Sequence, residues 1–314
     1  MNVGRFVALL LVLALPVVAT AQKKPADVFT DPREAGPDFK FQGEYEGNVG
    51  GEKFGAQVVA LGGGKFDIYF LKGGLPGAGW DGKTRTRIPT GVDKEKTVFA
   101  TRGWSGEISD GKISGKTADG GAIDLKHVER KSPTVGAKPP QGAVVLFDGS
   151  NADEWANGKL VEGNLLRWGT HSKKGFGAGK LHVEFRTPFQ PKARGQGRGN
   201  SGVYIHNTEI QVLDSFGLTG ANNECGAFYG FAKPAVNMCF PPLSWQTYDV
   251  EVKGGSKEGE LLATVWHNGV KVHEDFRLKG SASKPVTILL QDHGNPVAYR
   301  NIWFVPANSE SSRN

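Results

Sequence analysis

Two pairs of polar residues stand out because each alternates with apolar residues along a short stretch. His182 and Glu184 are separated by one residue, and Glu209 and Gln211 repeat that spacing. Residues two apart on a strand point to the same face of a sheet. If the two strands are neighbours, Glu184 and Glu209 lie about 5 Å apart, which suits acid and base work on a glycosidic bond. A solvated sheet face with ordinary ion pairs fits the same alternation, so both interpretations stand.

Histidines add a second kind of chemistry to the same region. His182, His206 and His293 share a polar face or a loop with carboxylates. Imidazole and carboxylate groups are common ligands of divalent metals. His182, Glu184, Glu209 and His293 are therefore candidate ligands for a divalent metal ion. No fixed spacing such as H-x-x-x-H requires a metal, and solvated histidines are the alternative.

The elements that must position these residues are strands. Period-2 alternation of apolar and polar residues makes one face apolar and the other polar. Asn268-Gly269 between two such runs predicts a type I′ hairpin. We expect a two-sheet sandwich whose concave sheet displays the polar residues. The predicted strands are 181–186, 202–206, 209–213, 247–253, 262–267, 270–274, 286–290 and 297–304.

A small β-rich domain of unknown role is expected at 38–130. Short strand-like runs occur there, and Asp110-Gly111 marks a hairpin. Its predicted strands are 57–61, 65–71, 97–100, 106–109, 112–115 and 122–125. A Pro-rich linker at 131–142 separates it from the second domain at 143–307. Residues 22–37 are expected to be poorly ordered, and 308–314 form a polar tail.

Composition agrees with a turn-rich, all-β protein. The chain has 45 glycines in 314 residues, about twice the ~7% of an average protein. Glycine inside a helix costs about 1 kcal/mol relative to alanine, which argues against a helical bundle. The 7 Trp, 18 Phe and 6 Tyr provide a core, which argues against a disordered chain.

The N-terminus has the pattern of a secretory signal peptide. A basic start is followed by an apolar run at 6–18 and by Ala19-Thr20-Ala21, so we expect cleavage after Ala21 and a periplasmic or secreted protein. No later run reaches the ~20 apolar residues of a membrane helix. Export exposes Cys225 and Cys239, the only two cysteines, to an oxidising compartment. We therefore predict a disulfide between them.

The net charge says little about partners. The chain carries +6 at pH 7, and nucleic-acid binding needs basic residues gathered on one face. The densest basic run is 192–199 (KARGQGRG), which we interpret as a flexible loop beside a site. No nucleic-acid partner is expected.

Seven motifs in the second domain occur in a characteristic order. They are 144–149 (VVLFDG) with Trp155, 199–204 (GNSGVY), 209–215 (EIQVLDS), 224–230 (ECGAFYG), Pro241-Pro242 with 245–249 (WQTYD), 290–294 (LQDHG) and 300–302 (RNI). Together they resemble the 3-keto-disaccharide hydrolase domain family over residues 143–307. The first domain resembles no family that we recognise.

The resemblance implies a concanavalin A-like jelly-roll sandwich and cleavage of 3-keto-glycosides. A ketone at C3 acidifies the C2 hydrogen, so a base can remove it and the C1 aglycone can leave before water adds back. That route needs a base, an acid and a stabiliser for the enolate. A divalent metal held by His and Glu could take over that stabilisation. The expected enzyme is a hydrolase or lyase acting on a carbohydrate.

The expected roles follow that chemistry. Glu184 and Glu209 are the carboxylate pair, one of them the base, and His293 is an acid or a metal ligand. The candidate substrate-binding residues are Asn200, Tyr204, Gln211, Tyr229, Gln291 and Arg300. Two other classes remain: a lectin-like carbohydrate-binding module, and an envelope interaction protein in which the first domain recognises the partner.

Overall fold

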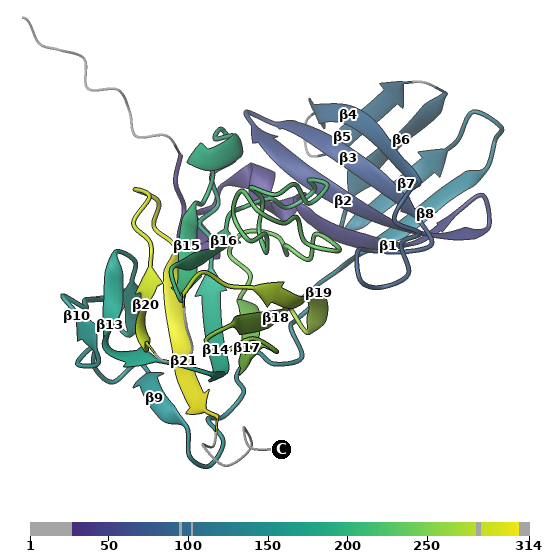
Figure 1. Cartoon of the computed structure of the whole chain (residues 1–314). Coiled ribbons are helices and arrows are strands. Elements are labelled where there is room, and N and C mark those ends of the chain that lie inside the picture. The colour runs from purple at the N-terminus through teal and green to yellow at the C-terminus, as the bar shows by residue number, and fades with distance from the viewer. Residues whose placement is uncertain (1–26, 94–95, 102, 281–283, 308–314) are drawn as a thin grey trace, which may run out of the picture.

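The computed structural model describes residues 27–93, 96–101, 103–280 and 284–307 (Figure 1). The predicted signal peptide and the predicted tail at 308–314 lie outside the described residues. Within the described ranges, helices are limited to short 3-10 turns: η1 (Pro32–Glu34), η2 (Pro37–Lys40) and η3 (Gly195–Gly197). None of the helices in this part of the chain could cross a bilayer.

Eight antiparallel strands form a closed barrel at the N-terminal side. Each strand pairs with the next in the chain, and β8 closes the barrel on β1. Asp110 and Gly111 both have positive φ, as a type I′ turn requires. The strands are β1 (Gly43–Val49), β2 (Glu52–Gly62), β3 (Lys65–Lys72), β4 (Arg85–Asp93), β5 (Lys96–Thr101), β6 (Trp104–Ser109), β7 (Lys112–Lys116) and β8 (Ala122–Val128).

The C-terminal part is a sandwich of two antiparallel sheets, so the predicted all-β sandwich is confirmed. The five-stranded sheet has the order β10 (Trp155–Ala156), β13 (Thr170–Phe176), β20 (Val286–Leu290), β15 (Ser201–Ile205) and β16 (Thr208–Val212). The eight-stranded sheet has the order β11 (Leu160–Val161), β12 (Leu165–Arg167), β21 (Ala298–Pro306), β14 (Gly179–Arg186), β17 (Gln246–Gly254), β18 (Leu261–His267) and β19 (Val270–Arg277), with β9 (Val144–Phe147) paired to β21.

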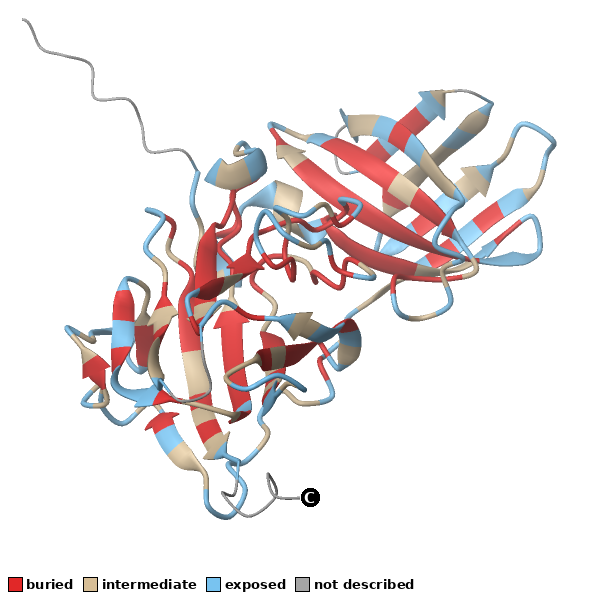
Figure 2. Ribbon diagram, viewed as in Figure 1, coloured by how far each residue is buried: buried red, intermediate tan, exposed pale blue. Residues whose placement is uncertain are grey.

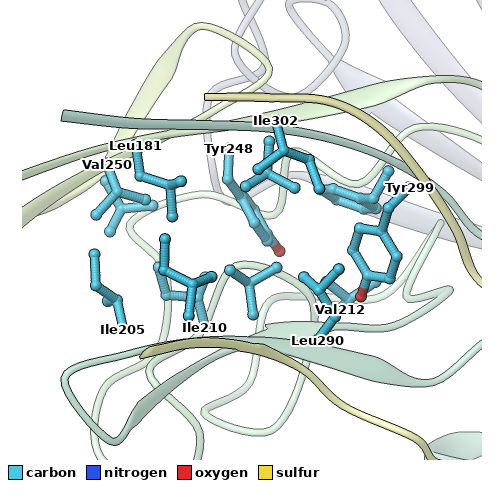
Figure 3. Packing of buried hydrophobic residues seen from close by; sticks show 14 of the residues in the cluster. Leu181, Ile205, Ile210, Val212, Tyr248, Val250, Leu290, Tyr299 and Ile302 are labelled. Atoms are coloured by element: carbon cyan, nitrogen blue, oxygen red, sulfur yellow. The ribbon is translucent and has the colours of Figure 1, made fainter. Parts of the chain in front are cut away.

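The sandwich core lies between the two sheets. Leu181 and Tyr248 descend from the eight-stranded sheet and meet Ile205, Ile210 and Val212 of the five-stranded sheet (Figure 3). These apolar residues alternate with polar ones on every strand concerned. The polar side chains of the two sheets therefore point away from each other, on opposite outer faces of the sandwich.

The barrel and the sandwich are joined by more than the linker. Arg198 donates from Nη1 to the Ala60 carbonyl at 3.3 Å, and Arg194 donates from Nη2 to the Leu61 carbonyl at 2.9 Å. The basic run at 192–199 is therefore a docking segment between the two units. Figure 2 shows the two buried cores on either side of this junction.

The described part of the segment before the barrel, 27–37, is also docked, whereas poor order was expected over 22–37; residues 22–26 lie outside the described residues. In its described part, Phe29 and Phe189 exchange two main-chain hydrogen bonds of 3.0 and 2.9 Å. Their rings lie 6.0 Å apart, and Phe189 is fully buried. The apolar contact between Phe29 and Phe189 offsets the entropy cost of ordering this polar stretch. Composition alone does not reveal that Phe29 makes this contact.

Candidate functional site

Glu184 and Glu209 do not form a pair, which corrects the prediction from alternation. Glu184 belongs to β14 in the eight-stranded sheet and Glu209 belongs to β16 in the five-stranded sheet. Both alternate with core residues, so their side chains leave the sandwich in opposite directions. The prediction was wrong because alternation fixes the face of a strand but not the sheet to which the strand belongs.

Glu184 is fully buried beneath the linker and has a complete set of partners. Its Oε1 accepts from the Gly136 main-chain N–H at 2.5 Å and from Asn301 Nδ2 at 2.8 Å. Its Oε2 accepts from Arg300 Nε at 2.7 Å. Arg300, predicted to bind a sugar, thus lies on the same outer face as Glu184 and supports it.

His182 completes this polar cluster on the eight-stranded sheet. Its Nδ1 lies 2.6 Å from Asp249 Oδ1 and its Nε2 lies 3.6 Å from Glu184 Oε1. Its ring stacks on Trp303 with centroids 4.9 Å apart. Burial acts to lower the pKa of His182, but hydrogen bonds with Asp249 and Glu184 raise it overall.

The electrostatics of Glu184 are those of a structural ion pair. Burial acts to raise its pKa, but the hydrogen bonds from His182, Asn301, Gly136 and Arg300 together lower it to about 2. A carboxylate this strongly stabilised in its charged form is a weak base. Glu184 therefore fastens the linker to the sheet.

Glu209 lies in a row of polar side chains across the five-stranded sheet. Tyr204 on β15 is the register partner of Glu209 on β16. Beyond β16, residues near Phe228 pair with the strand edge, and the Tyr229 N–H donates to the Glu209 carbonyl at 3.1 Å. Opposed residues point to the same face, so Tyr204, Glu209 and Tyr229 share the outer surface.

The Glu209 carboxylate is oriented by a short hydrogen-bonded chain. Tyr204 donates its hydroxyl proton to Glu209 Oε2 at 2.7 Å and accepts from Gln291 Nε2 at 3.1 Å. Oε1 of Glu209 has no hydrogen-bond partner among the described residues. Burial raises the pKa of Glu209, against the lowering effects of the Tyr204 hydrogen bond and the nearby His293. Burial and the adjacent carboxylate raise the pKa of Tyr204, so Tyr204 stays a donor.

Gly202 provides the space for this carboxylate. It lies on β15 as the register partner of Gln211, beside Glu209. A Cβ placed on Gly202 would come within 2.5 Å of Glu209 Oε1. The missing side chain in the GNSGVY motif therefore lets the Glu209 carboxylate fold back over the sheet.

Three amide oxygens around Glu209 are buried without a hydrogen-bond partner in the described part of the chain. They are Asn200 Oδ1, Gln211 Oε1 and Gln291 Oε1. The corresponding amide nitrogens are bonded: Asn200 Nδ2 and Gln211 Nε2 both donate to Gln196 Oε1 at 3.0 Å. Buried acceptors without a donor are rare and costly in folded proteins. This group is therefore ready to accept hydrogen bonds from a ligand that brings hydroxyl groups.

Gln196 is a site residue that sequence reasoning missed. It lies in η3 within the basic run, and besides accepting from Asn200 and Gln211 it donates to the Asn223 carbonyl at 2.8 Å. From the sequence, the run 192–199 is interpreted only for its basic residues and not for Gln196. The signal that could have identified Gln196 was its closeness to the GNSGVY motif.

His293 lies on the exposed loop after β20, close enough to influence the charge of Glu209. His182 and Glu184 lie on the opposite outer face, so one metal ion cannot be held by all four predicted ligands, and that ligand set is wrong. Across the described ranges no group of three or more His, Cys, Asp or Glu side chains is arranged to hold a metal.

His206 occupies the β15 to β16 turn, with its Nε2 3.3 Å from the Gly177 carbonyl.

The structure does not show the predicted disulfide, because Cys225 and Cys239 are both buried free thiols in it. The two thiols contact each other through a side-chain hydrogen bond. Cys225 Sγ also lies 3.2 Å from the Tyr248 hydroxyl, and Cys239 Sγ lies 3.4 Å from the Leu213 carbonyl. Burial raises the pKa of the Cys239 thiol well above its usual value. Burial also acts to raise the pKa of the Cys225 thiol, but hydrogen bonds with Cys239 and Tyr248 lower it overall.

Solved structures of similar shape include two from Parabacteroides distasonis ATCC 8503, each provisionally named a glycosyl hydrolase. The one at 2.13 Å resolution is 26% identical, covers 54% of this chain and 85% of its own, and has a TM-score of 0.47. The one at 1.70 Å resolution is 18% identical, covers 54% and 95%, and has a TM-score of 0.40. The search of curated proteins found no match.

A family profile covers just over half of the chain. It includes β15 and β16, the strands that carry Tyr204 and Glu209. It matches residues 142–305, from the end of the linker to the last strand. The motifs that gather on the five-stranded sheet, from Asn200 to Gln291, all lie inside this range. The chain therefore belongs to the 3-keto-alpha-glucoside-1,2-lyase-like domain family.

Proposed function

We propose that the protein cleaves 3-keto-glycosides on the outer face of the five-stranded sheet, with Glu209 as the base. One observation carries the proposal: a carboxylate with a free oxygen lies among three buried amide oxygens that lack donors. A pyranose presents several hydroxyl donors in a small volume, so it fits this acceptor set. Family membership supports the 3-keto sugar as the substrate class.

The first chemical step is removal of the C2 hydrogen. Glu209 Oε1 takes this proton, the C2–H electron pair forms an enolate with the C3 ketone, and the C1–O bond to the aglycone then breaks. Water afterwards adds across the C1=C2 bond, with hydroxyl at C1 and hydrogen at C2, to release the 3-keto sugar. The raised pKa of Glu209 makes it a stronger base than an ordinary carboxylate.

The neighbouring residues orient the base, protonate the leaving group and bind the sugar. Tyr204 holds Oε2 of Glu209, so that Oε1 faces the substrate. His293, on the exposed loop beside Glu209, gives a proton to the departing aglycone oxygen. Gln211, Asn200 and Gln291 accept hydrogen bonds from sugar hydroxyls, and the half-exposed ring of Tyr229 packs against the pyranose.

The test compares two carboxylates in one sandwich. Wild type, Glu209→Gln and Glu184→Gln are incubated with a chromogenic 3-keto-glucoside, and aglycone release is followed. We expect Glu209→Gln to lose at least about a thousandfold in kcat, because the base is gone. Glu184→Gln should keep kcat within about threefold at a temperature where it remains folded. Full turnover by Glu209→Gln would refute the assignment.

A lectin-like module is the second candidate, favoured by the exposed Tyr229 beside the amide oxygens. It predicts saturable binding of a neutral sugar without aglycone release by the wild type. Binding that Glu209→Gln retains, with no turnover by wild type at any pH from 5 to 9, would favour the module.

We also propose that the protein is exported. Export is supported by the basic start, apolar run and Ala19-Thr20-Ala21 sequence. N-terminal sequencing of the protein recovered outside the cytoplasm should begin at Gln22.

A further inference from the structure

A cavity away from the Glu209 site lies where the barrel, the linker and the sandwich meet. Its volume is about 590 Å³. Ligand pockets usually occupy about 300–1,000 Å³ and are frequent at domain interfaces. The wall is formed by the segment around η2, the end of β8, the linker start, the loop at 241–245 and Arg300.

The floor of this cavity is a closed ion pair. Glu44 is buried and accepts from Arg130 at both oxygens, each at 2.6 Å. The remaining guanidinium nitrogen of Arg130 donates to the Pro76 carbonyl at 2.7 Å. This pair is satisfied internally, so it fixes the shape of the cavity and leaves its own charges neutralised.

The rest of the lining is more cationic than acidic. Glu44 compensates Arg130 and Glu184 compensates Arg300, which leaves Lys40 and Lys131 against the single carboxylate of Glu129. Lys40 and Lys131 are exposed, so they attract an anion from solution rather than bind it tightly.

The guanidinium of Arg300 is held in a fixed orientation that leaves its terminal nitrogens free to bind an anion. Its Nε is bonded to Glu184 and its guanidinium lies 3.9 Å from the centre of the Trp245 ring. These two contacts fix the plane of the group. Its two terminal nitrogens make no hydrogen bond to any residue in the described ranges, and about a third of its side chain is exposed. A planar guanidinium with a free edge matches the two oxygens of a carboxylate.

Gln42 is a further polar residue of the lining. It lines the cavity and is 96% buried, with its Oε1 accepting from the Ala60 N–H at 3.0 Å. Its Nε2 has no partner among the described residues. An unsatisfied buried amide donor is costly unless a ligand oxygen meets it.

We propose that this interdomain cavity binds a carboxylated sugar such as a uronate. The carboxylate pairs with Arg300, a hydroxyl or ring oxygen accepts from Gln42, and the C–H face of the ring lies against the apolar wall. That wall consists of Phe39, Pro241, Pro242, Leu243 and Trp245. The site lies on the Glu184 side of the sandwich, separate from the acceptor cluster at Glu209.

The test measures binding of glucuronic acid to the full mature chain by isothermal titration calorimetry at low salt. Glucose and inorganic phosphate are the comparison ligands. We expect glucuronic acid to bind at least tenfold more tightly than either. No saturable binding, or equal binding of glucose, would overturn the proposal. Phosphate binding as tight as that of glucuronic acid would reduce the site to a general anion site and would also overturn it.

Three variants locate the binding. Arg300→Lys keeps a positive charge near Glu184 but loses the planar fork, so affinity should fall about tenfold. Lys131→Met, an exposed change that preserves folding, should weaken binding about threefold. Arg167→Lys is the matched control, since Arg167 also stacks on a tryptophan, Trp168, outside the cavity. It should have no effect.

Glu209→Gln separates this proposal from the proposed function. It should leave glucuronic acid binding unchanged even where it abolishes turnover. If Glu209→Gln removes the binding while Arg300→Lys and Lys131→Met retain it, the acidic sugar binds on the five-stranded sheet and the cavity proposal fails.

Discussion

The two outer faces of the sandwich carry nearly the same sequence pattern and have opposite characters. On the eight-stranded sheet, Glu184 has its hydrogen bonds completed by Gly136, Asn301 and Arg300. On the five-stranded sheet, Glu209 has one bonded oxygen, and three amide oxygens nearby lack donors. A face whose polar groups are satisfied holds the protein together, whereas a face with unsatisfied acceptors is prepared for a ligand.

The direction of the pKa shifts separates the faces in the same way. Partners outweigh burial at Glu184 and lower its pKa to about 2, whereas burial outweighs the partners at Glu209 and raises its pKa. The folded protein therefore stabilises the charge of one carboxylate and destabilises the charge of the other.

The largest expected effect on stability comes from Glu184→Gln. Removing this charge leaves Arg300 and His182 with less compensation, so the free energy of unfolding at pH 7 should fall by about 3 kcal/mol. Glu209→Gln should change it by less than about 1 kcal/mol, because the folded state already disfavours that charge. Urea denaturation monitored by tryptophan fluorescence measures both.

The pH dependence provides the control for that comparison. The folded pKa of Glu184 lies below its unfolded value near 4.5, so its contribution is complete above that pH and is lost as the pH falls toward about 2. The difference between wild type and Glu184→Gln should shrink over this window. A difference that is constant from pH 7 to pH 2 would contradict the charged role of Glu184.

An intermediate effect is expected from Tyr204→Phe. Loss of the hydroxyl frees Oε2 of Glu209 and removes a hydrogen bond that lowers the Glu209 pKa. The acid limb of kcat/KM should move to higher pH, and the maximum should fall by about ten- to a hundredfold. The measurement is a pH–rate profile with the 3-keto-glucoside. An acid limb that stays in place would show that Tyr204 does not hold the base.

The smallest effect is expected from Gly202→Ala. The added methyl group would lie 2.5 Å from Glu209 Oε1, so the flexible end of that side chain must move by about half an ångström or more; kcat should fall by about tenfold while stability hardly changes. Gly254→Ala, at the end of β17 with open space around it, is the control. Equal kcat in both variants would mean that the Gly202 position does not shape the site.

The sequence predicted the strands better than their arrangement. Alternation located 181–186 and 209–213, and Asn268-Gly269 forms the expected hairpin with both residues at positive φ. It could not place β14 and β16 in different sheets, because that choice depends on pairing between distant strands. Barrel closure, in which β1 pairs with β8, has the same non-local origin.

Only part of the candidate site could be predicted, because the sequence does not show which strands pair. The motifs placed Asn200, Tyr204, Gln211, Tyr229 and Gln291 on strands or edges that do meet on one sheet. Arg300 comes from a similar motif, but its strand, β21, belongs to the other sheet. Gln196 was missed because its role comes from a loop folding back, which no periodicity encodes.

The contact between Gly136 and Glu184 also bears on how the chain can be divided. A fragment that begins at residue 143 would retain every strand of the sandwich but would lose the main-chain donor that the buried carboxylate needs. Water would then reach one side of β14. The sandwich therefore uses a linker residue that lies upstream of the range matched by the family profile.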